Sequence, residues 1–260
     1  MFANDIAITL KRVKFEDRHQ ILTLLTLNHG KISAMAHNSI HSRRFGSALQ
    51  LYEVSECRLF KRNNQNTFRI ESANSKERFS NIPKNWMAYI NACFFSELIL
   101  NLIPENETDP NLFKLFYNGL KTLDSLNSTA SLPIQVSFLG KLLQRSGHQP
   151  SIISCASCGK LKTSPSINLS ITAGGRVCCE PSDFSVQLTS IEQYLTLLKT
   201  PLRSALSLTD YLHADFEKLF QFQLGILTEF APEARLEEMK SLKLLNDHKS
   251  NSQPQLMSLQ

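Results

Sequence analysis

Apolar and polar residues alternate with a period of two through much of the first third of the chain, which is the pattern of half-buried β-strands. The segment Asn28-His29-Gly30 separates two of these runs and predicts a turn, because Asn and Gly accept positive φ. Residues 37–48 follow no clear period and predict a long loop. Five strands are therefore expected, over residues 6–11, 21–27, 31–36, 52–60 and 67–71.

Five short strands joined by hairpins and one long loop, all within residues 5–72, fit a small closed barrel. The count and the length favour the OB type, whose strand face and loops bind oligonucleotides in many proteins. An SH3-like barrel fits the pattern almost as well, so both barrel types stay open at this point.

The period changes to that of helices after Pro83. Residues 84–103 are apolar nearly all round, which predicts a core helix with Trp86 buried at its start. Asp109-Pro110 predicts the beginning of another helix, because Asp caps free backbone N–H groups and Pro is tolerated at the first helical position. Further helices are expected over residues 133–146, 189–199, 201–208 and 209–230, and a disordered tail is expected over the polar residues 247–260.

Four of the six cysteines lie within 25 residues, which favours a metal site in a reducing compartment over a disulfide framework. The first pair, Cys155 and Cys158, forms a knuckle that ends in a glycine, and a structural zinc ion needs four such ligands. The second pair, Cys178 and Cys179, is adjacent in sequence, and adjacent side chains rarely both reach one ion. The alternative is a packed loop that has lost its metal. Candidates for the fourth ligand are Cys179, Glu180, Asp183, His148 and His213.

Together these patterns predict an α+β fold, with an N-terminal OB-fold β-barrel followed by an all-helical domain and an inserted Cys-rich, zinc-ribbon-like module. The expected domains are residues 1–80 for the barrel and residues 81–246 for the helices, with the cysteine module at residues 151–187.

The excess positive charge lies entirely in the predicted barrel. Residues 1–80 hold 13 basic and 7 acidic side chains, a net charge of +6, whereas residues 81–260 hold 15 basic and 16 acidic side chains, a net charge of −1. Because a positive groove attracts phosphates and releases counterions, this distribution favours DNA as the ligand, with little sequence preference. A solvated basic face without a ligand is the plainer interpretation.

Aromatic side chains on which bases stack are the second half of single-strand binding. Phe45, which Arg44 and Gly46 flank, is the favoured stacking residue; Phe15 and Tyr52 are further candidates, whereas Phe60 and Phe68 are expected in the core. The predicted DNA-binding residues are Lys11, Arg12, Lys14, Arg18, Lys31, Arg43, Arg44, Phe45, Arg58, Lys61, Arg62 and Arg69.

The sequence lacks the motifs that mark several classes of enzyme. The chain has no Gly-x-x-x-x-Gly-Lys-Ser/Thr phosphate loop, no His-Glu-x-x-His and no Gly-x-Ser-x-Gly, so neither ATP hydrolysis nor any catalytic residue is expected. Polar residues interrupt the most apolar stretch, Trp86–Ile103, which predicts a buried helix and no membrane span. The N-terminus lacks the pattern of a signal peptide, so the expected location is the cytoplasm.

Three stretches of the chain resemble the RecO family of bacterial recombination mediators. Residues 22–34 (LTLLTLNHGKISA) are similar to the family's first hairpin, residues 42–50 (SRRFGSALQ) to its basic loop, and residues 155–179 to its cysteine region. The resemblance implies an OB fold, a helical C-terminal domain and a zinc-binding module. It also implies a nucleoid-associated protein that binds and anneals single- and double-stranded DNA. With a RecR-type partner, such a protein helps to load the recombinase onto strands coated by single-strand-binding protein.

The chain departs from the family pattern at two places. Pro181 stands where a second Cys-x-x-Cys would end, which leaves the fourth metal ligand open. His37-Asn38 stands where the family often has Lys-Gly, so a phosphate contact there would be charged only at lower pH.

The sequence therefore predicts a non-enzymatic, ATP-independent mediator that binds DNA through the barrel and proteins through the helices. A scaffold that assembles a complex without touching DNA is the alternative from another class. A nuclease is a third interpretation, although no paired-carboxylate metal site can be located in the sequence.

Overall fold

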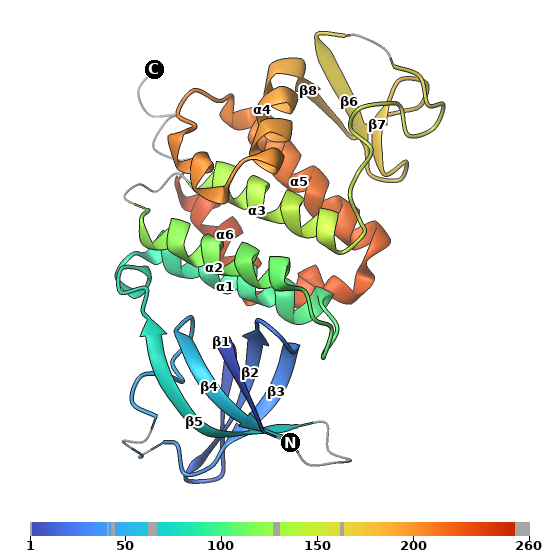
Figure 1. The fold of residues 1–260 in the computed structure, drawn as a ribbon. Helices are drawn as coiled ribbons and strands as arrows, with labels where there is room; N and C mark the ends of the chain where they lie inside the picture. Colours follow the sequence, from blue (N-terminus) through green and yellow to red (C-terminus); the bar gives the residue numbers. More distant parts are fainter. Residues whose placement is uncertain are drawn as a thin grey trace.

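The structure is a computed structural model that describes residues 2–40, 42, 45–61, 67–126, 131–161 and 164–252. It divides into a β-barrel, a group of helices that lies across one end of the barrel, and a small sheet at the far side of the helices (Figure 1).

The barrel closes in the order β1-β2-β3-β5-β4, with β4 pairing back onto β1. Strand β3 skips its neighbour in sequence and pairs in parallel with β5, which is the Greek-key connectivity of the OB fold and decides between the two barrel types. The strands are β1 (Phe2–Phe15), β2 (His19–Thr26), β3 (Gly30–Ala36), β4 (Val54–Phe60) and β5 (Phe68–Glu77).

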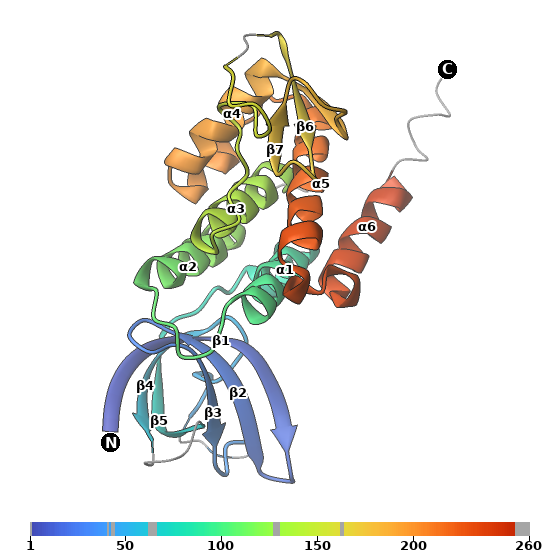
Figure 2. The same cartoon turned by 90° about the vertical axis from the view of Figure 1, so that its right-hand side faces the viewer.

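Strand β1 is long enough to belong to both sides of the barrel. Residues 2–8 pair with β4, and residues 7–15 pair with β2, with an irregularity in register between Thr9 and Lys11. Figure 2 shows the consequence: β1 rises from the N-terminus toward the helices, bends there, and descends again to the β1–β2 turn at the opposite end of the barrel.

The helical region begins with α1, which is apolar nearly all round because it is covered on two sides. Ser96 Oγ donates a hydrogen bond to Leu10 O of β1 at 3.1 Å, while Phe95 stacks on Phe138 of α3 with ring centroids 3.7 Å apart. The α-helices are α1 (Trp86–Leu102), α2 (Pro110–Asp124), α3 (Leu132–Arg145), α4 (Leu188–Lys199), α5 (His213–Phe230) and α6 (Lys240–Ser252).

Helix starts follow the predicted capping chemistry where the sequence carried a signal for it. Asp109 accepts a hydrogen bond from Asn111 N at 2.8 Å, with Pro110 as the first helical residue. Asn85 caps α1 in the same way by accepting from Ala88 N. These side chains satisfy backbone donors that a helix leaves free at its first turn.

Three details of the helical prediction were wrong. Trp86 is 53% exposed, because it lies in the first turn of α1 while its neighbours Met87 and Ala88 turn toward the core. The segment predicted as a helix over 201–208 is a 3₁₀ helix, Leu202–Ser207. The polar tail was expected from residue 247, but α6 continues as a helix to Ser252, and residues 253–260 lie outside the described part.

The inserted module is a three-stranded antiparallel sheet in the order β7-β6-β8, whose strands are β6 (Ser166–Ser170), β7 (Gly175–Val177) and β8 (Phe184–Gln187). It packs on α5, where Ile171 occupies the space that a side chain at Gly225 would need. The zinc-ribbon-like module predicted as an insertion into the helices is thus a small sheet held against a helix.

Candidate nucleic-acid interface and cysteine cluster

The end of the barrel away from the helices, here called the distal end, brings together the β1–β2 turn and the chain that follows β3. Asn38 N donates to His19 Nδ1 at 2.9 Å, and Ile40 N donates to Arg18 O at 3.3 Å. The rings of His19 and His37 meet edge to face with centroids 5.0 Å apart. Two segments separated in sequence therefore lie side by side at this end, where none of the described helices covers them (Figure 2).

One row of outward-facing side chains runs around the barrel toward this end. Cross-strand partners in a sheet point to the same face, so the row can be followed from pair to pair across all five strands. Inward neighbours such as Leu22 and Ala34 are fully buried, which confirms that the row faces outward. In order, this row, here called the outer row, consists of Phe2, Phe60, Arg69, Met35, Ile21 and Val13.

Most of the predicted cations within the described residues reach solvent: Lys11, Arg12, Lys14, Arg18, Arg58 and Arg69 are exposed and Lys61 is half-buried. Two of them rest on aromatic rings: Arg58 lies 4.8 Å from the ring centre of Phe2, and Lys61 lies 4.9 Å from that of Phe68. Such contacts hold a cation in place without neutralising it. Arg69 pairs with Glu71 at 3.0 Å, which reduces its availability for phosphate. Arg43, Arg44 and Arg62 lie outside the described residues.

Lys31 was wrongly assigned to the DNA surface. It is buried, and its Nζ donates a hydrogen bond of 2.6 Å to Leu100 O at the end of α1. Burial lowers the pKa of Lys31 below its usual value, and nearby Glu105 offsets part of that effect. Lys31 is the second residue of β3, at the end of the barrel that the helices contact, so it joins the barrel to α1.

Phe45 was wrongly chosen as the stacking residue. It is only 4% exposed and belongs to the barrel core with Ala48 and Leu49, because the long loop folds back over the barrel. Tyr52 is buried as well, whereas Phe15 is 39% exposed beside Lys14 on the descending arm of β1. Of these three candidates, only Phe15 is exposed.

The two aromatic residues expected in the core differ from each other. Phe68 is buried as predicted. Phe60 is half-buried and packs on Phe2 with ring centroids 4.8 Å apart, so it contributes to the outer row. The outer row itself was missed in the sequence, although a signal for it existed in the alternation of Ile21 and Met35 against the buried residues of β2 and β3.

The side chain of His37 loses its proton more readily than that of an isolated histidine. Desolvation, and after it the positive charge of Arg69 and the neighbouring His19, lower the pKa of His37 below its usual value. Desolvation and these neighbouring groups therefore disfavour the protonated form, although Glu71 and Glu16 oppose them, and a nearby phosphate would favour it.

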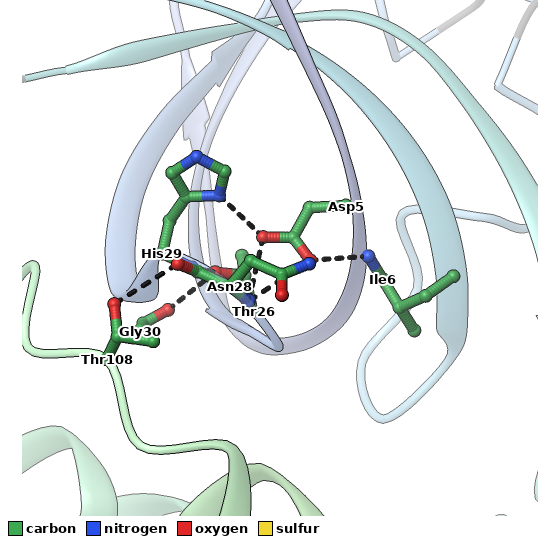
Figure 3. A network of polar contacts seen from close by, with 7 residues as sticks. All are labelled: Asp5, Ile6, Thr26, Asn28, His29, Gly30 and Thr108. Atoms are coloured by element: carbon green, nitrogen blue, oxygen red, sulfur yellow. Dashed lines mark hydrogen bonds and ion pairs between the residues drawn. The ribbon is translucent and has the colours of Figure 1, made fainter.

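A polar network around the buried carboxylate of Asp5 fixes the opposite end of the barrel (Figure 3). The carboxylate of Asp5 in β1 accepts hydrogen bonds from Ile6 N at 2.8 Å, from the backbone and side chain of Asn28, and from His29 Nδ1 at 2.6 Å. Thr108, just before α2, donates to Asn28 O at 3.1 Å. One carboxylate thus ties the β2–β3 turn to β1, and the turn in turn contacts the helical domain.

Gly30 explains how closely this turn approaches the helices. Its φ is +68°, and a Cβ at this position would overlap Glu107 O. Only glycine meets both conditions, since other residues rarely adopt this φ and carry the side chain that would clash.

The four clustered cysteines converge on one point. Their Sγ atoms all lie within 4.8 Å of one another, with Cys155 to Cys179 at 3.9 Å and Cys158 to Cys178 at 3.5 Å. A tetrahedral ion with metal–sulfur bonds of about 2.3 Å places its sulfurs about 3.8 Å apart. The donor set and its spacing therefore fit a single metal ion.

Adjacent Cys178 and Cys179 were expected to point apart, and that expectation was wrong. Both follow the end of β7 on a bend, where the alternation of a strand no longer applies. Of the alternative ligands, Asp183 accepts a hydrogen bond from Ile171 N, and neither it nor a histidine joins the cluster within the described residues.

Backbone geometry supports the first knuckle. Gly159 N donates to Cys155 O at 2.9 Å, and Ala156 N donates to Arg176 O at 2.7 Å, which ties the knuckle to β7. Backbone N–H groups of the knuckle, that of Cys158 most strongly, lower the pKa of Cys155 to about 6. A side chain at position 175 would overlap the backbone of Ser151, which passes against Gly175. Cys155 therefore favours the thiolate, the form that binds metal, whereas hydrogen bonds to Cys158 and Cys155 raise the pKa values of Cys178 and Cys179.

The fold and these two sites define a class of protein: an OB-fold barrel with exposed cations on its strands, followed by a helical domain that carries a four-cysteine module. Two family models match the chain, Recombination protein O N terminal over residues 1–79 and Recombination protein O C terminal over residues 83–210. The chain belongs to the RecO family of DNA repair and recombination proteins.

Curated relatives agree with this assignment. The chain is 30% identical to the DNA repair protein RecO of Caldanaerobacter subterraneus subsp. tengcongensis, over 68% of this chain and 70% of the relative. It is 26% identical to that of Syntrophotalea carbinolica over 74% and 72%, and 27% identical to that of Alkaliphilus metalliredigens over 82% and 88%. None of the helices in the described ranges is long and apolar enough to cross a membrane.

Proposed function

We propose that this protein binds single- and double-stranded DNA at the distal end of its barrel and promotes annealing of complementary strands. The observation that carries the proposal is the convergence of cations with exposed apolar side chains on an OB barrel surface free of helices. Lys14 and Arg18 supply charge there, and Phe15 and Val13 supply apolar contact. Single-strand binders combine these two elements, a basic groove and stacking platforms.

The bound strand would follow the outer row around the barrel. Cations from Lys11 to Arg18, with Arg58 and Lys61, would contact phosphates, while Phe15 would stack on a base. Little in this set reads base edges, so sequence preference should be weak. Arg43, Arg44 and Arg62 lie outside the described residues, and on their charge alone we propose that they add to the contacts.

The cellular role follows from the family. We propose a non-enzymatic, ATP-independent mediator in the cytoplasm, associated with the nucleoid. With a RecR-type partner it would help to load the recombinase onto strands coated by single-strand-binding protein. The near-neutral helical domain would dock these proteins while the barrel holds DNA.

The metal that the cysteine cluster would hold is zinc, because four thiolates in a tetrahedron suit a closed structural zinc site. Cys155, Cys158, Cys178 and Cys179 would be the ligands, and the ion would hold the two cysteine pairs together.

Salt dependence of DNA binding tests the proposed interface. The double variant Lys14→Gln/Arg18→Gln should lower affinity for labelled oligo-dT and flatten the plot of log K against log salt. The expected loss of slope is about 0.7 per phosphate contact on a single strand, hence about 1.4. The matched control is Lys199→Gln/Arg203→Gln, which removes two exposed charges from the helical domain. An equal slope in the barrel variant and the control would overturn the assignment.

Two further outcomes distinguish the alternative functions. Failure of the wild-type chain to bind either form of DNA at low salt would favour the scaffold without DNA. Cleavage of labelled DNA in the presence of magnesium would favour a nuclease.

A further inference from the structure

A cavity of about 230 Å³ opens where the barrel meets the start of α1. Aromatic and aliphatic side chains line it, among them Leu51, Tyr52, Phe79 and Tyr89, and the guanidinium groups of Arg12 and Arg78 lie at its edge. We call it the junction cleft. The proposed DNA surface at the distal end does not include it.

The volume limits what can enter the junction cleft. Pockets for whole drug-sized ligands begin at roughly 300 Å³, so the cleft has room for a single flat ring system with its edges held by polar groups. Leu51 and Tyr89 are partly exposed at the opening, whereas Tyr52 and Phe79 are buried. An incoming ring would therefore find apolar walls without a rearrangement of the core.

The charge at the cleft is positive. Arg12 donates a hydrogen bond of 2.7 Å to Gln50 Oε1, a neutral partner that leaves the guanidinium charge uncompensated. Arg78 is exposed and has Glu53 at 4.0 Å, but that carboxylate is buried and accepts hydrogen bonds from Ser47 and Ser75. The cleft is thus lined by two cations, both at exposed residues, against one carboxylate, that of the buried Glu53.

Two aromatic side chains extend the cleft along α1. Trp86 and Tyr89 are three residues apart and so share a helix face, and they are 53% and 36% exposed. Tyr89 meets Tyr52 edge to face, with ring centroids 6.4 Å apart. Exposed aromatic rings next to arginines are the combination on which single-stranded bases stack.

Strand β1 connects the distal end to the junction cleft. Side chains two apart on a strand lie on one face, about 7 Å from each other, so Lys14 and Arg12 form a basic path from the β1–β2 turn to the cleft. Lys11 and Val13 occupy the other face, which carries the outer row. The descending arm of β1 therefore has a basic edge that ends at Arg12.

We propose that the junction cleft is a second contact for single-stranded DNA, in which a base of the strand that leaves the distal end stacks against Tyr89 and Trp86. Arg12 and Arg78 contact the adjoining phosphates. The inference rests on the proposed DNA binding at the distal end and extends that path toward the helices. Single-stranded DNA is favoured over a protein partner because the cleft accommodates one ring, its edge is cationic, and a basic path leads into it.

The only tryptophan of the chain allows a direct test, because Trp86 is exposed and shares a face of α1 with Tyr89, which lines the cleft. Fluorescein-labelled oligo-dT is titrated into the full-length wild-type chain, and anisotropy of the label and Trp86 emission are recorded in parallel. Binding should quench Trp86 emission with the same midpoint as the anisotropy change. The variant Tyr89→Ala/Arg78→Gln should lose about fivefold or more in affinity, the low end for one lost base stack, and should lose most of the quenching.

Two control variants test whether a loss of affinity comes from misfolding. Tyr89→Phe keeps the ring and should retain wild-type affinity, and Phe230→Ala/Arg203→Gln removes an exposed aromatic side chain and an exposed arginine from the helical domain and should also retain it. Circular dichroism confirms that each variant is folded.

The outcomes separate this inference from the proposed function. If DNA raises the anisotropy but neither Trp86 emission nor the affinity of Tyr89→Ala/Arg78→Gln changes, the junction cleft is no DNA site and the distal interface still stands. A folded Tyr89→Phe that binds as weakly as the alanine variant would also overturn the stacking role. If the wild-type chain gives no anisotropy change, the proposed DNA binding itself has failed.

Discussion

Replacement of Asp5 by alanine should destabilise the barrel more than any other single change at a polar residue of β1. The side chain of Asp5 is buried, and its carboxylate accepts hydrogen bonds from Ile6 N, Asn28 N, Asn28 Nδ2 and His29 Nδ1. Alanine would leave these donors without a partner. Because a hydrogen bond to a charged group contributes about 1.5–3 kcal/mol and solvent can satisfy part of this network, we expect a net loss of about 3–5 kcal/mol.

Such a loss is large against a typical domain stability of about 5–15 kcal/mol. Urea unfolding followed by far-UV circular dichroism measures it, with Trp86 emission as a second probe because the barrel and the helices can unfold separately. Asp5→Asn keeps the shape and some acceptor capacity, so it should lose less than Asp5→Ala.

A double-mutant cycle isolates the central contact. Asp5→Ala and His29→Ala remove the two ends of the 2.6 Å interaction, and the coupling energy between them should lie at about 0.5–3 kcal/mol. Thr108→Ala, which removes only a surface hydrogen bond of the same turn, should cost less than 1.5 kcal/mol. Additive effects of Asp5→Ala and His29→Ala, or an unchanged urea midpoint for Asp5→Ala, would refute the view that this carboxylate fixes the turn.

Four other changes have defined outcomes. Lys31→Met should leave DNA affinity in gel shifts unchanged, because the ammonium group is bonded to Leu100 O; a tenfold loss would return Lys31 to the DNA surface. Phe45→Ala should cost about 3–5 kcal/mol in urea unfolding as a core truncation, while the folded fraction keeps its affinity for DNA. Since the pKa of His37 is lowered, it is neutral at pH 7.5 and gains charge as the pH falls, so DNA affinity should rise from pH 7.5 to pH 5.5 and His37→Gln should flatten that rise. Elemental analysis should find one zinc ion per chain and less in Cys158→Ser, whose DNA binding should persist because the cluster lies in the module across the helices from the barrel (Figure 1).

The barrel could be predicted because each strand carries its own alternation. Local sequence is enough to say that Ile32 and Ala34 face inward, and both are fully buried. The same signal says nothing about which end of the barrel the helices close. Lys31 therefore looked like a surface cation in the sequence, although contact with α1 removes it from solvent, and Trp86 looked buried although its helix turn projects beyond the core.

Loops and bends account for the other errors. Phe45 lies between residues typical of an exposed loop, and only the return of that loop over the barrel, with Ala48 and Leu49, buries it. The direction of Cys178 and Cys179 depends on where β7 ends, which a strand of three residues does not reveal in sequence. In each case the deciding contact is distant along the chain, where a local pattern carries no information.

The arrangement of the domains constrains where DNA can lie on the barrel. The helices contact one end of the barrel through Lys31, Gly30 and Thr108, so the barrel is free of helices at its distal end within the described residues. On the proposed function, DNA is then restricted to the distal end and to the arm of β1 that descends to it. Part of the +6 net charge of the first 80 residues then lies along one path on the barrel. Lys14 and Arg12 of β1 form this path, which leads from the distal end back toward α1. A strand on this path would reach the helical domain at the junction cleft, so DNA bound to the barrel and proteins docked on the helices would meet there.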